Sequence, residues 1–172
     1  MHWGNTADVK VGAFIRKWVE AYTGSDTIKL ERNMNLWAIV KQHLDIRPDD
    51  GTEISDRSEY ISIELLDTTG AKYYNMAAGK DMYMNTLYRC YITTRGQEII
   101  QRYLENQFIA HFRVYMTARF SDGGNEPIRH AIGSFLADYQ LPMDDTMMGR
   151  LSKNWYRFRQ KHKENYPIPI FF

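Results

Sequence analysis

The chain has 172 residues, of which 44% are hydrophobic and 14% aromatic, and its 22 Lys and Arg against 21 Asp and Glu give a formal net charge of +1. This length suits one domain, and the apolar content excludes disorder along most of the chain. No apolar run reaches the roughly 20 residues of a membrane-spanning helix, and the single cysteine, Cys90, excludes an internal disulfide and a multi-cysteine zinc site. Since no basic segment followed by an apolar one opens the chain, we expect a cytoplasmic location and no membrane partner.

The first part of the chain, residues 8–45, predicts a pair of helices. Val11, Ile15, Trp18 and Tyr22 repeat at helical spacing, which predicts a helix over residues 8–22 that Gly24 ends. A short extended segment is expected at residues 27–31. A second helix follows around residues 36–44 and ends before Pro48, because the residue before a proline disfavours helical geometry.

Residues 46–93 predict an acidic loop followed by a small hairpin. The loop, residues 47–58, is rich in carboxylates, whereas Ile61 and Ile63 alternate with polar residues and predict a half-buried strand over residues 60–66. Turn-forming residues at 67–70 then allow residues 72–76 to return as its antiparallel partner. Residues 82–93 fit a helix or a strand, and their Tyr and Thr content favours the strand.

Three helices are predicted in the C-terminal section, residues 94–165. A capping box from Thr94 to Gln97 begins a long helix that continues to about residue 119, with apolar residues at every fourth position. The next helix covers residues 128–139, with Asn125 as its cap and Pro127 in its first turn. The last helix covers residues 146–163 and is capped by Asp144 or Asp145.

These elements predict an α+β fold that is predominantly helical, with about five helices and one small antiparallel β-hairpin, in a single domain over residues 1–172. The core is expected to be built from the large apolar residues on the predicted buried faces. They are Phe14, Trp18, Trp37, Ile100, Leu104, Phe108, Phe112, Phe135, Leu136, Leu151, Trp155 and Phe158.

The last predicted helix carries the clearest functional pattern in the sequence. Residues 146–163 hold six Lys or Arg and no Asp or Glu. Four of these cations share one helix face because they are three and four residues apart: Arg150, Lys153, Arg157 and Lys161. A second stripe at similar spacing is mainly apolar and consists of Met148, Leu151, Trp155, Phe158 and His162. The pattern predicts a helix with one face for the core and another for anions.

The two last helices, joined by a short connection, predict a helix-turn-helix-like unit that binds nucleic acid. The four cations would neutralise phosphates, while Asn154, Gln160 and Arg157 would reach base edges. Two other interpretations stay open: the cations only solvate the helix, or they meet an acidic protein surface such as residues 45–59 of a neighbouring molecule.

The alternative function rests on the apolar segment that follows this helix. Residues 166–172 read Tyr-Pro-Ile-Pro-Ile-Phe-Phe, and Ile168, Ile170, Phe171 and Phe172 would expose a large apolar area unless they dock. The segment either closes over its own core or docks on another subunit. The second case predicts a structural or adaptor subunit of a homo-oligomer or larger assembly.

Sequence motifs for catalysis or metal binding are absent from the chain. Its five histidines have no paired ligand spacing, and there is neither a glycine-rich phosphate loop nor a nucleophile elbow. We therefore predict a non-enzymatic protein with no metal and no cofactor.

Overall fold

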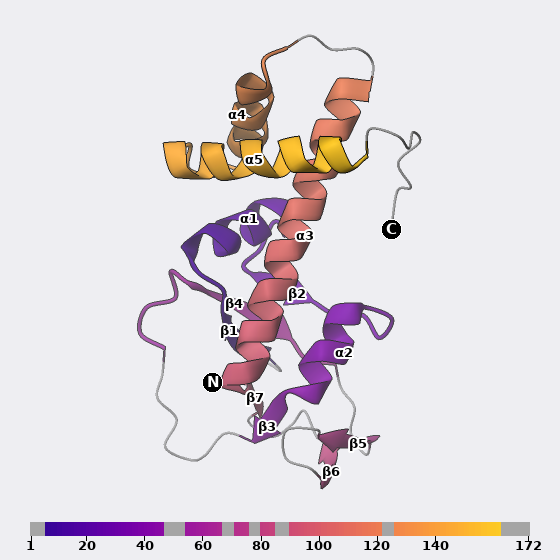
Figure 1. The fold of residues 1–172 in the computed structure, drawn as a ribbon. Helices are drawn as coiled ribbons and strands as arrows, with labels where there is room; N and C mark the ends of the chain where they lie inside the picture. The colour runs from indigo at the N-terminus through magenta and orange to yellow at the C-terminus, as the bar shows by residue number, and fades with distance from the viewer. Residues whose placement is uncertain are drawn as a thin grey trace. The chain divides into compact units, whose positions relative to one another are not determined.

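A computed structural model describes residues 6–46, 54–66, 71–75, 80–84, 90–121 and 126–162 (Figure 1). The elements in these ranges are, in chain order, β1 (Thr6–Lys10), α1 (Ala13–Thr23), β2 (Thr27–Lys29), α2 (Asn35–Gln42), β3 (Leu44–Ile46), β4 (Tyr60–Glu64), β5 (Ala71–Asn75), β6 (Lys80–Met84), β7 (Cys90–Ile92), α3 (Thr94–Ser121), α4 (Ile128–Asp138) and α5 (Asp145–Lys161). The predicted class, α+β and predominantly helical with five helices, is confirmed for the described residues. Contacts cluster into two compact units, Met1–Glu105 and Asn106–Phe172.

The first unit contains a three-stranded sheet with β4 at its centre, antiparallel to β1 and parallel to β2. Ala7 and Val9 of β1 pair across the sheet with Ile63 and Ile61 of β4, and all four side chains are buried. The prediction that a helix begins at residue 8 is therefore wrong. In β1 the side chains are buried at every second residue, as in a strand, and the helical spacing begins only after it. Gly12, with φ of +80°, separates β1 from α1.

Strand pairing also differs from the predicted hairpin. Because β4 is occupied on both edges by β1 and β2, the described residues 72–75 do not return along it. The backbone of β5 instead pairs antiparallel with β6, and β3 pairs antiparallel with β7. The strand favoured for residues 82–93 is confirmed at its two ends, by β6 and β7, while the predicted turn at residues 67–70 lies outside the described residues.

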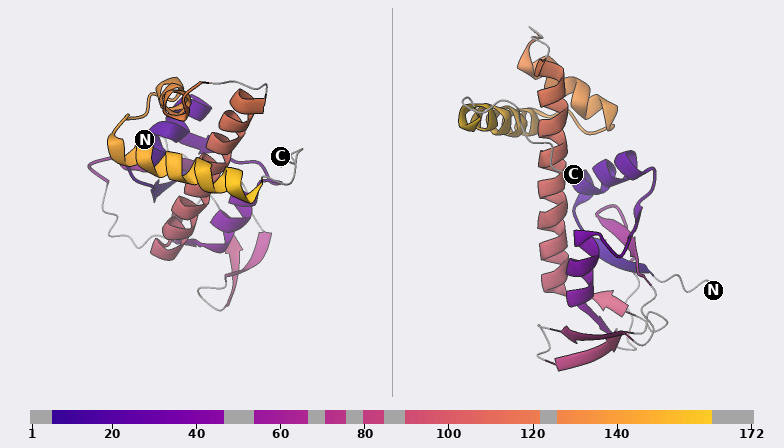
Figure 2. Two further views of the ribbon diagram at one scale, coloured as in Figure 1. Left: turned by 45° about the horizontal axis from the view of Figure 1, so that its top comes forward. Right: turned by 90° about the vertical axis from the view of Figure 1, so that its right-hand side faces the viewer.

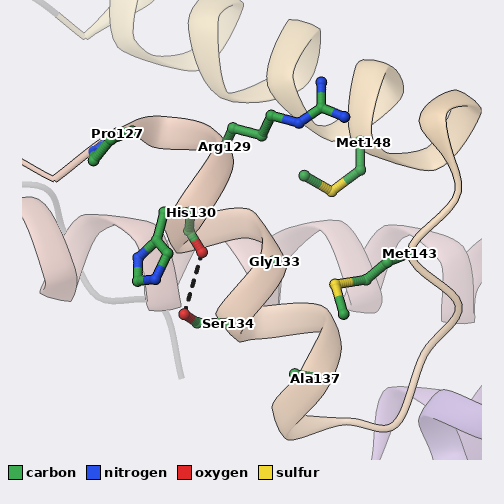
Figure 3. Close-up of a pocket in the computed structure, with 8 residues that line it drawn as sticks. All are labelled: Pro127, Arg129, His130, Gly133, Ser134, Ala137, Met143 and Met148. Carbon is green, nitrogen blue, oxygen red and sulfur yellow. Dashed lines mark hydrogen bonds between the residues drawn. The ribbon is translucent and has the colours of Figure 1, made fainter.

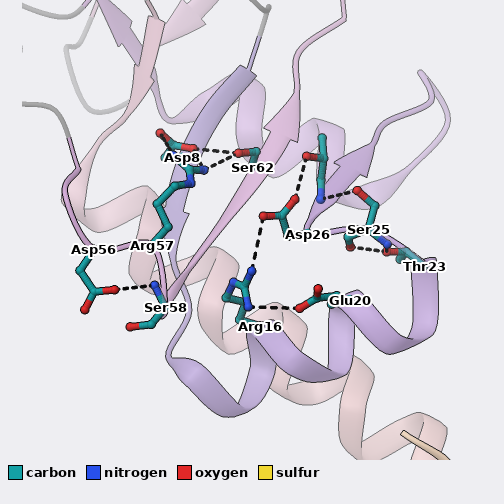
Figure 4. A network of polar contacts seen from close by, with 11 residues as sticks. Asp8, Arg16, Glu20, Thr23, Ser25, Asp26, Asp56, Arg57, Ser58 and Ser62 are labelled. Atoms are coloured by element: carbon teal, nitrogen blue, oxygen red, sulfur yellow. Dashed lines mark hydrogen bonds and ion pairs between the residues drawn. The ribbon is translucent and has the colours of Figure 1, made fainter. Parts of the chain in front are cut away.

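Polar side chains link the strands and the helix of this sheet (Figure 4). The Arg57 guanidinium binds the Asp8 carboxylate at 2.7 Å and donates to Ser62 Oγ at 2.7 Å, while Ser62 Oγ donates to Asp8 at 2.9 Å. The hydrogen bond to Asp8 raises the pKa of the Arg57 guanidinium further above its usual range. On α1, Arg16 bridges Glu20 and Asp26 at 3.1 and 3.5 Å. These hydrogen bonds and ion pairs connect β1 with β4 and tie α1 to the residue that precedes β2.

α3 begins at Thr94, and its first turn is capped by the residue before the predicted cap. Thr93 Oγ1, rather than the Thr94 hydroxyl, accepts a hydrogen bond from the Gly96 amide at 3.2 Å. The Gln97 side chain donates to the Ile92 carbonyl and accepts from the Lys10 amide, so it joins the start of α3 to β7 and to β1. Two adjacent threonines offer the same hydroxyl, so the sequence pattern alone does not distinguish Thr93 from Thr94 as the cap.

Gly96 lies where α3 meets the end of α2. A Cβ at this position would lie 2.4 Å from His43 Cβ and 2.9 Å from Ile92 Cγ2, distances that force backbone or buried side chains to move. We expect Gly96→Ala to lower the unfolding free energy by about 1–3 kcal/mol, the usual cost of overpacking.

Gly149 on α5 provides a matched glycine-to-alanine substitution that should raise the unfolding free energy instead of lowering it. A Cβ at Gly149 would have no atom within 4 Å, so Gly149→Ala adds only helix propensity and should stabilise by about 0.5–1 kcal/mol. Urea unfolding of both variants measures the difference. Equal effects of the two substitutions would contradict the close approach of Gly96 to His43.

The second unit packs α4 and α5 against the C-terminal part of α3. α5 runs steeply across α3 in Figure 1 and in the left view of Figure 2. Phe135 of α4 is the centre of the aromatic core: it is 0% exposed, and its ring lies 5.1–5.8 Å, centroid to centroid, from five other rings. These rings belong to Phe108, His111, Phe112, Tyr115 and Tyr139.

Most of the predicted core is buried. The structure leaves Phe14 and Phe158 half-buried, and it buries the other residues of the predicted set, namely Trp18, Trp37, Ile100, Leu104, Phe108, Phe112, Phe135, Leu136, Leu151 and Trp155. The predicted cap Asn125 lies outside the described residues. Pro127 occupies the N-cap position of α4 instead of its first turn.

Candidate nucleic-acid interface

α5 is held to its unit by one side of the helix. Its buried residues are Met148, Leu151 and Trp155. The Trp155 ring is 3% exposed and stacks between Phe120 and Phe158 at centroid distances of 6.0 and 5.7 Å. Among the described residues its Nε1 has no hydrogen-bond partner, so ring contacts provide the anchorage.

The first turn of α5 is capped by one of the two residues that the sequence offered for this position. Asp144 is the N-cap, and its carboxylate accepts from the Met147 amide at 2.7 Å. Asp145 lies in the first turn and pairs with Arg129 at 2.9 Å. Both carboxylates therefore stabilise the N-terminus of the helix, where the free amides of the first turn favour negative charge.

The four-cation stripe lies on the exposed side of α5. Arg150, Lys153, Arg157 and Lys161 are all exposed, and no carboxylate in residues 106–121 or 126–162 lies within 4.0 Å of their charged nitrogens. Like charges three and four residues apart on a helix repel each other by about 0.2–0.5 kcal/mol a pair. The stripe thus lowers the stability of α5, except at Lys161, which lies in the last turn, where the helix dipole favours a cation.

The two predicted base-reading amides of α5 occupy different environments. Gln160 is exposed beside the stripe, whereas Asn154 is half-buried at its edge. Asn154 Oδ1 accepts from Arg113 Nε of α3 at 3.0 Å, and the Arg113 guanidinium lies 5.0 Å from the centroid of the Phe158 ring. Burial lowers the pKa of Arg113. This hydrogen bond joins α3 to α5, and Arg113, which no sequence pattern indicated, lies at the border of the stripe.

The predicted partner-binding residues Ile168, Ile170, Phe171 and Phe172 lie outside the described residues. The same unit does contain an open groove of about 690 Å³ between α4, the segment that connects it to α5, and the first turn of α5 (Figure 3). Its lining residues are Pro127, Arg129, His130, Gly133, Ser134, Ala137, Met143 and Met148.

A histidine and a serine at this groove do not form a nucleophile–base pair. Ser134 Oγ donates to the backbone carbonyl of His130 (Figure 3). His130 Nδ1 contacts the Glu126 carboxylate at 2.9 Å. Hydrogen bonds from Arg119 and then from His130 lower the pKa of Glu126. Within the described ranges, no three His, Cys, Asp or Glu side chains are placed to hold a metal ion.

His111 predicts a pH dependence of stability for this unit. Tyr139 Oη and His111 Nε2 lie 3.0 Å apart, and burial lowers the pKa of His111 below its usual 6.5. The unfolded chain therefore takes up this proton first, so the stability conferred by neutral His111 is complete above about pH 6.5 and is lost as pH falls through the folded pKa.

Urea unfolding at a series of pH values between neutral and mildly acidic tests this expectation. The unfolding free energy should fall on acidification, and His111→Gln should reduce the slope. A residual slope is expected from His43, whose pKa is lowered by burial and by Arg95. A wild-type protein that gained stability below pH 6.5 would contradict this assignment.

None of the helices in the described residues is both long and apolar enough to cross a bilayer. No protein-family model, curated protein or solved structure matches this chain. We therefore infer a function from the geometry of the second unit alone.

Proposed function

We propose that this protein binds nucleic acid through the exposed cationic face of α5, without a catalytic step. The observation that carries the proposal is the exposed four-cation stripe, which has no carboxylate partner among the described residues. It lies on a helix whose opposite side is anchored by Met148, Leu151 and Trp155. A helix held in this way presents its charges as a fixed array. Phosphate groups then bind with little loss of conformational entropy beyond that of the side chains.

The dimensions of the stripe favour duplex DNA. Arg150 and Lys161 are eleven residues apart, or about 16 Å along the axis, and a helix with its side chains is about 10–12 Å across. The major groove of B-form DNA is about 12 Å wide and admits such a helix, whereas the deep major groove of A-form RNA is too narrow. Arg157 and the exposed Gln160 are the side chains placed to reach base edges, because Asn154 Oδ1 is engaged by Arg113.

The α4–α5 pair also supports a helix-turn-helix-like arrangement. Two helices are joined by a short connection, residues 139–144, and the second of them carries the cations. In proteins that use this arrangement the second helix enters the major groove. The connection is longer than the three or four residues usual in such motifs, so the proposal depends on the charged face rather than on the motif.

Fluorescence anisotropy with labelled duplex DNA, duplex RNA and single-stranded DNA tests the proposal. We expect saturable binding at low salt, strongest for duplex DNA. Polyglutamate added as a competitor distinguishes a nucleic-acid site from a surface for acidic protein, because it matches the charge but not the shape of the duplex. Absence of binding at low salt would show that the stripe only solvates the helix, and displacement by polyglutamate at equal charge concentration would favour an acidic protein partner.

A further inference from the structure

One arginine of the second unit is half-buried without a carboxylate beside it. Arg113 Nε of α3 donates to Asn154 Oδ1 of α5 at 3.0 Å, and its guanidinium lies 5.0 Å from the centroid of the Phe158 ring. Among the residues that the structure describes, Arg113 forms no ion pair, whereas Arg119 and Arg129 of the same unit each pair with a carboxylate. Partial burial of a charge without a counter-ion costs free energy, so this position calls for an explanation.

The guanidinium of Arg113 keeps most of its hydrogen-bonding capacity. The bond to Asn154 uses the Nε–H and leaves the N–H groups of Nη1 and Nη2 without a partner in the described part of the chain. Neither terminal nitrogen is among the buried unpartnered atoms, so both keep some exposure to solvent. The bond to Asn154 and the ring of Phe158 orient this planar fork before any ligand arrives. Such a fork matches two oxygens of a phosphate or a carboxylate.

Three cations of the stripe lie close to the two residues that hold this guanidinium. Arg150 is four residues before Asn154 and Arg157 is three residues after it, while Lys161 is three residues after Phe158. Residues at these spacings are neighbours on the surface of a helix. Four positive charges, the guanidinium included, therefore lie around the contact between α3 and α5. A bound anion would offset both their mutual repulsion and the cost of burial.

The arrangement favours phosphate over carboxylate. The oxygens of a phosphate are arranged tetrahedrally, so the fork of Arg113 and a cation of α5 can approach it from different sides. A carboxylate is planar, and a bidentate guanidinium already occupies the edge that carries its two oxygens. Phosphate therefore matches the chemistry of this contact, either as the free anion or as part of a nucleic-acid backbone.

We propose that Arg113 is the centre of a phosphate-binding subsite, in which Nη1 and Nη2 bind one phosphate that Arg150 or Lys161 also neutralises. Asn154 and Phe158 are positioning residues, because they hold the guanidinium and act through it. The assignment of a backbone phosphate to this subsite rests on the proposed function, whereas its affinity for free phosphate does not. Since the phosphate is shared with the stripe, Arg113 adds affinity without adding to the number of phosphates contacted.

Arg113→Lys tests the subsite directly, because lysine keeps the charge and removes the fork. Its affinity for duplex DNA in anisotropy titrations should fall about tenfold, the effect of one lost charge-assisted hydrogen bond. The dependence of affinity on salt should stay as in the wild type, since no charge is lost. Arg159→Lys is the matched control, because Arg159 is exposed on α5 away from the stripe, and it should leave the affinity nearly unchanged.

A double-mutant cycle tests the positioning role of Asn154. Asn154→Ala keeps the guanidinium but removes the acceptor that orients it, so part of the affinity should be lost. In this background Arg113→Lys should cost much less than about tenfold, because the fork is no longer held in place. Losses that multiply independently would contradict the positioning role. Urea unfolding of each variant checks that the second unit stays folded.

Inorganic phosphate separates this inference from the proposed function and uses the wild-type protein. In proton–nitrogen correlation spectra, the assigned Nε–H signal of Arg113 should shift saturably with added phosphate and stay in place with chloride at equal ionic strength. A shift with phosphate in a protein that does not bind DNA would support the subsite, with free phosphate as its ligand, while the proposed function fails.

The opposite outcome is equally distinct. A signal that neither phosphate nor duplex DNA moves would overturn the subsite, even if the stripe binds DNA. Wild-type DNA affinity in a folded Arg113→Lys variant would overturn a backbone phosphate as the ligand.

Discussion

Replacing Lys153 and Arg157 with glutamate is expected to lower the affinity for duplex DNA by about two orders of magnitude near 0.1 M salt. Each phosphate contact contributes a slope of about −0.9 to the dependence of log K on log salt, so losing two contacts costs roughly 60-fold before the new repulsion is counted. Both side chains are exposed and lie in the middle of the stripe. Anisotropy titrations of the variant and the wild type measure the change.

The same double substitution should leave stability nearly unchanged. Carboxylates at positions 153 and 157 would face Arg150 and Lys161 at helical spacings of three and four residues, which makes these two repulsive pairs attractive. The two new carboxylates, four residues apart, repel each other as the two cations did. We expect the unfolding free energy to change by no more than about 0.5 kcal/mol. Loss of affinity together with a large loss of stability would mean that the substitutions act through the fold.

A matched control has the same change of net charge at other positions. Arg159 is exposed on α5, about 200° around the helix from Arg157, and Lys17 is exposed on α1. The double variant Arg159→Glu, Lys17→Glu should lose much less affinity than the reversal in the stripe. Equal losses in the two double variants would show that net charge, rather than a defined face, governs binding.

Phe135→Ala is expected to cause the largest loss of stability, about 3–5 kcal/mol. The substitution removes a fully buried ring that contacts the five rings around it and leaves a cavity between α3 and α4. Because α5 packs on the same unit, DNA binding should weaken under conditions where this unit unfolds. Chemical unfolding followed by tryptophan fluorescence reports the change, since Trp155 lies in this unit.

Val114→Ala is the control for this prediction. Val114 lies on α3 near Phe112 but is 57% exposed, so its truncation should cost less than about 0.5 kcal/mol. A cost for Phe135→Ala close to that of Val114→Ala would contradict the aromatic core.

Periodic patterns predicted the helices of the second unit because each one buries a single regular face. The every-fourth spacing of Ile100, Leu104, Phe108 and Phe112 is enough to specify α3, and all four side chains are buried. The stripe on α5 was predictable for the same reason: residues on one helix face keep their spacing whatever the helix packs against.

The strands were harder to predict because their partners are distant in the sequence. β4 pairs with β1, more than fifty residues earlier, so the apparent turn at residues 67–70 suggested the wrong neighbour. β1 was read as helix because the alternation of Ala7 and Val9 runs directly into the helical spacing of α1. The hydrogen bond between Arg113 and Asn154 joins residues 41 positions apart on two helices, and no local pattern indicates such a pair.

The dependence of DNA affinity on salt tests the central claim most directly. If Arg150, Lys153, Arg157 and Lys161 each neutralise one phosphate, a plot of log K against log salt for duplex DNA should have a slope of about −3.6. Reversal of the charges at Lys153 and Arg157 should make this slope shallower, with a magnitude of about 1.8 or smaller. A wild-type slope near zero, or a slope that the reversal leaves unchanged, would contradict binding through the exposed face of α5.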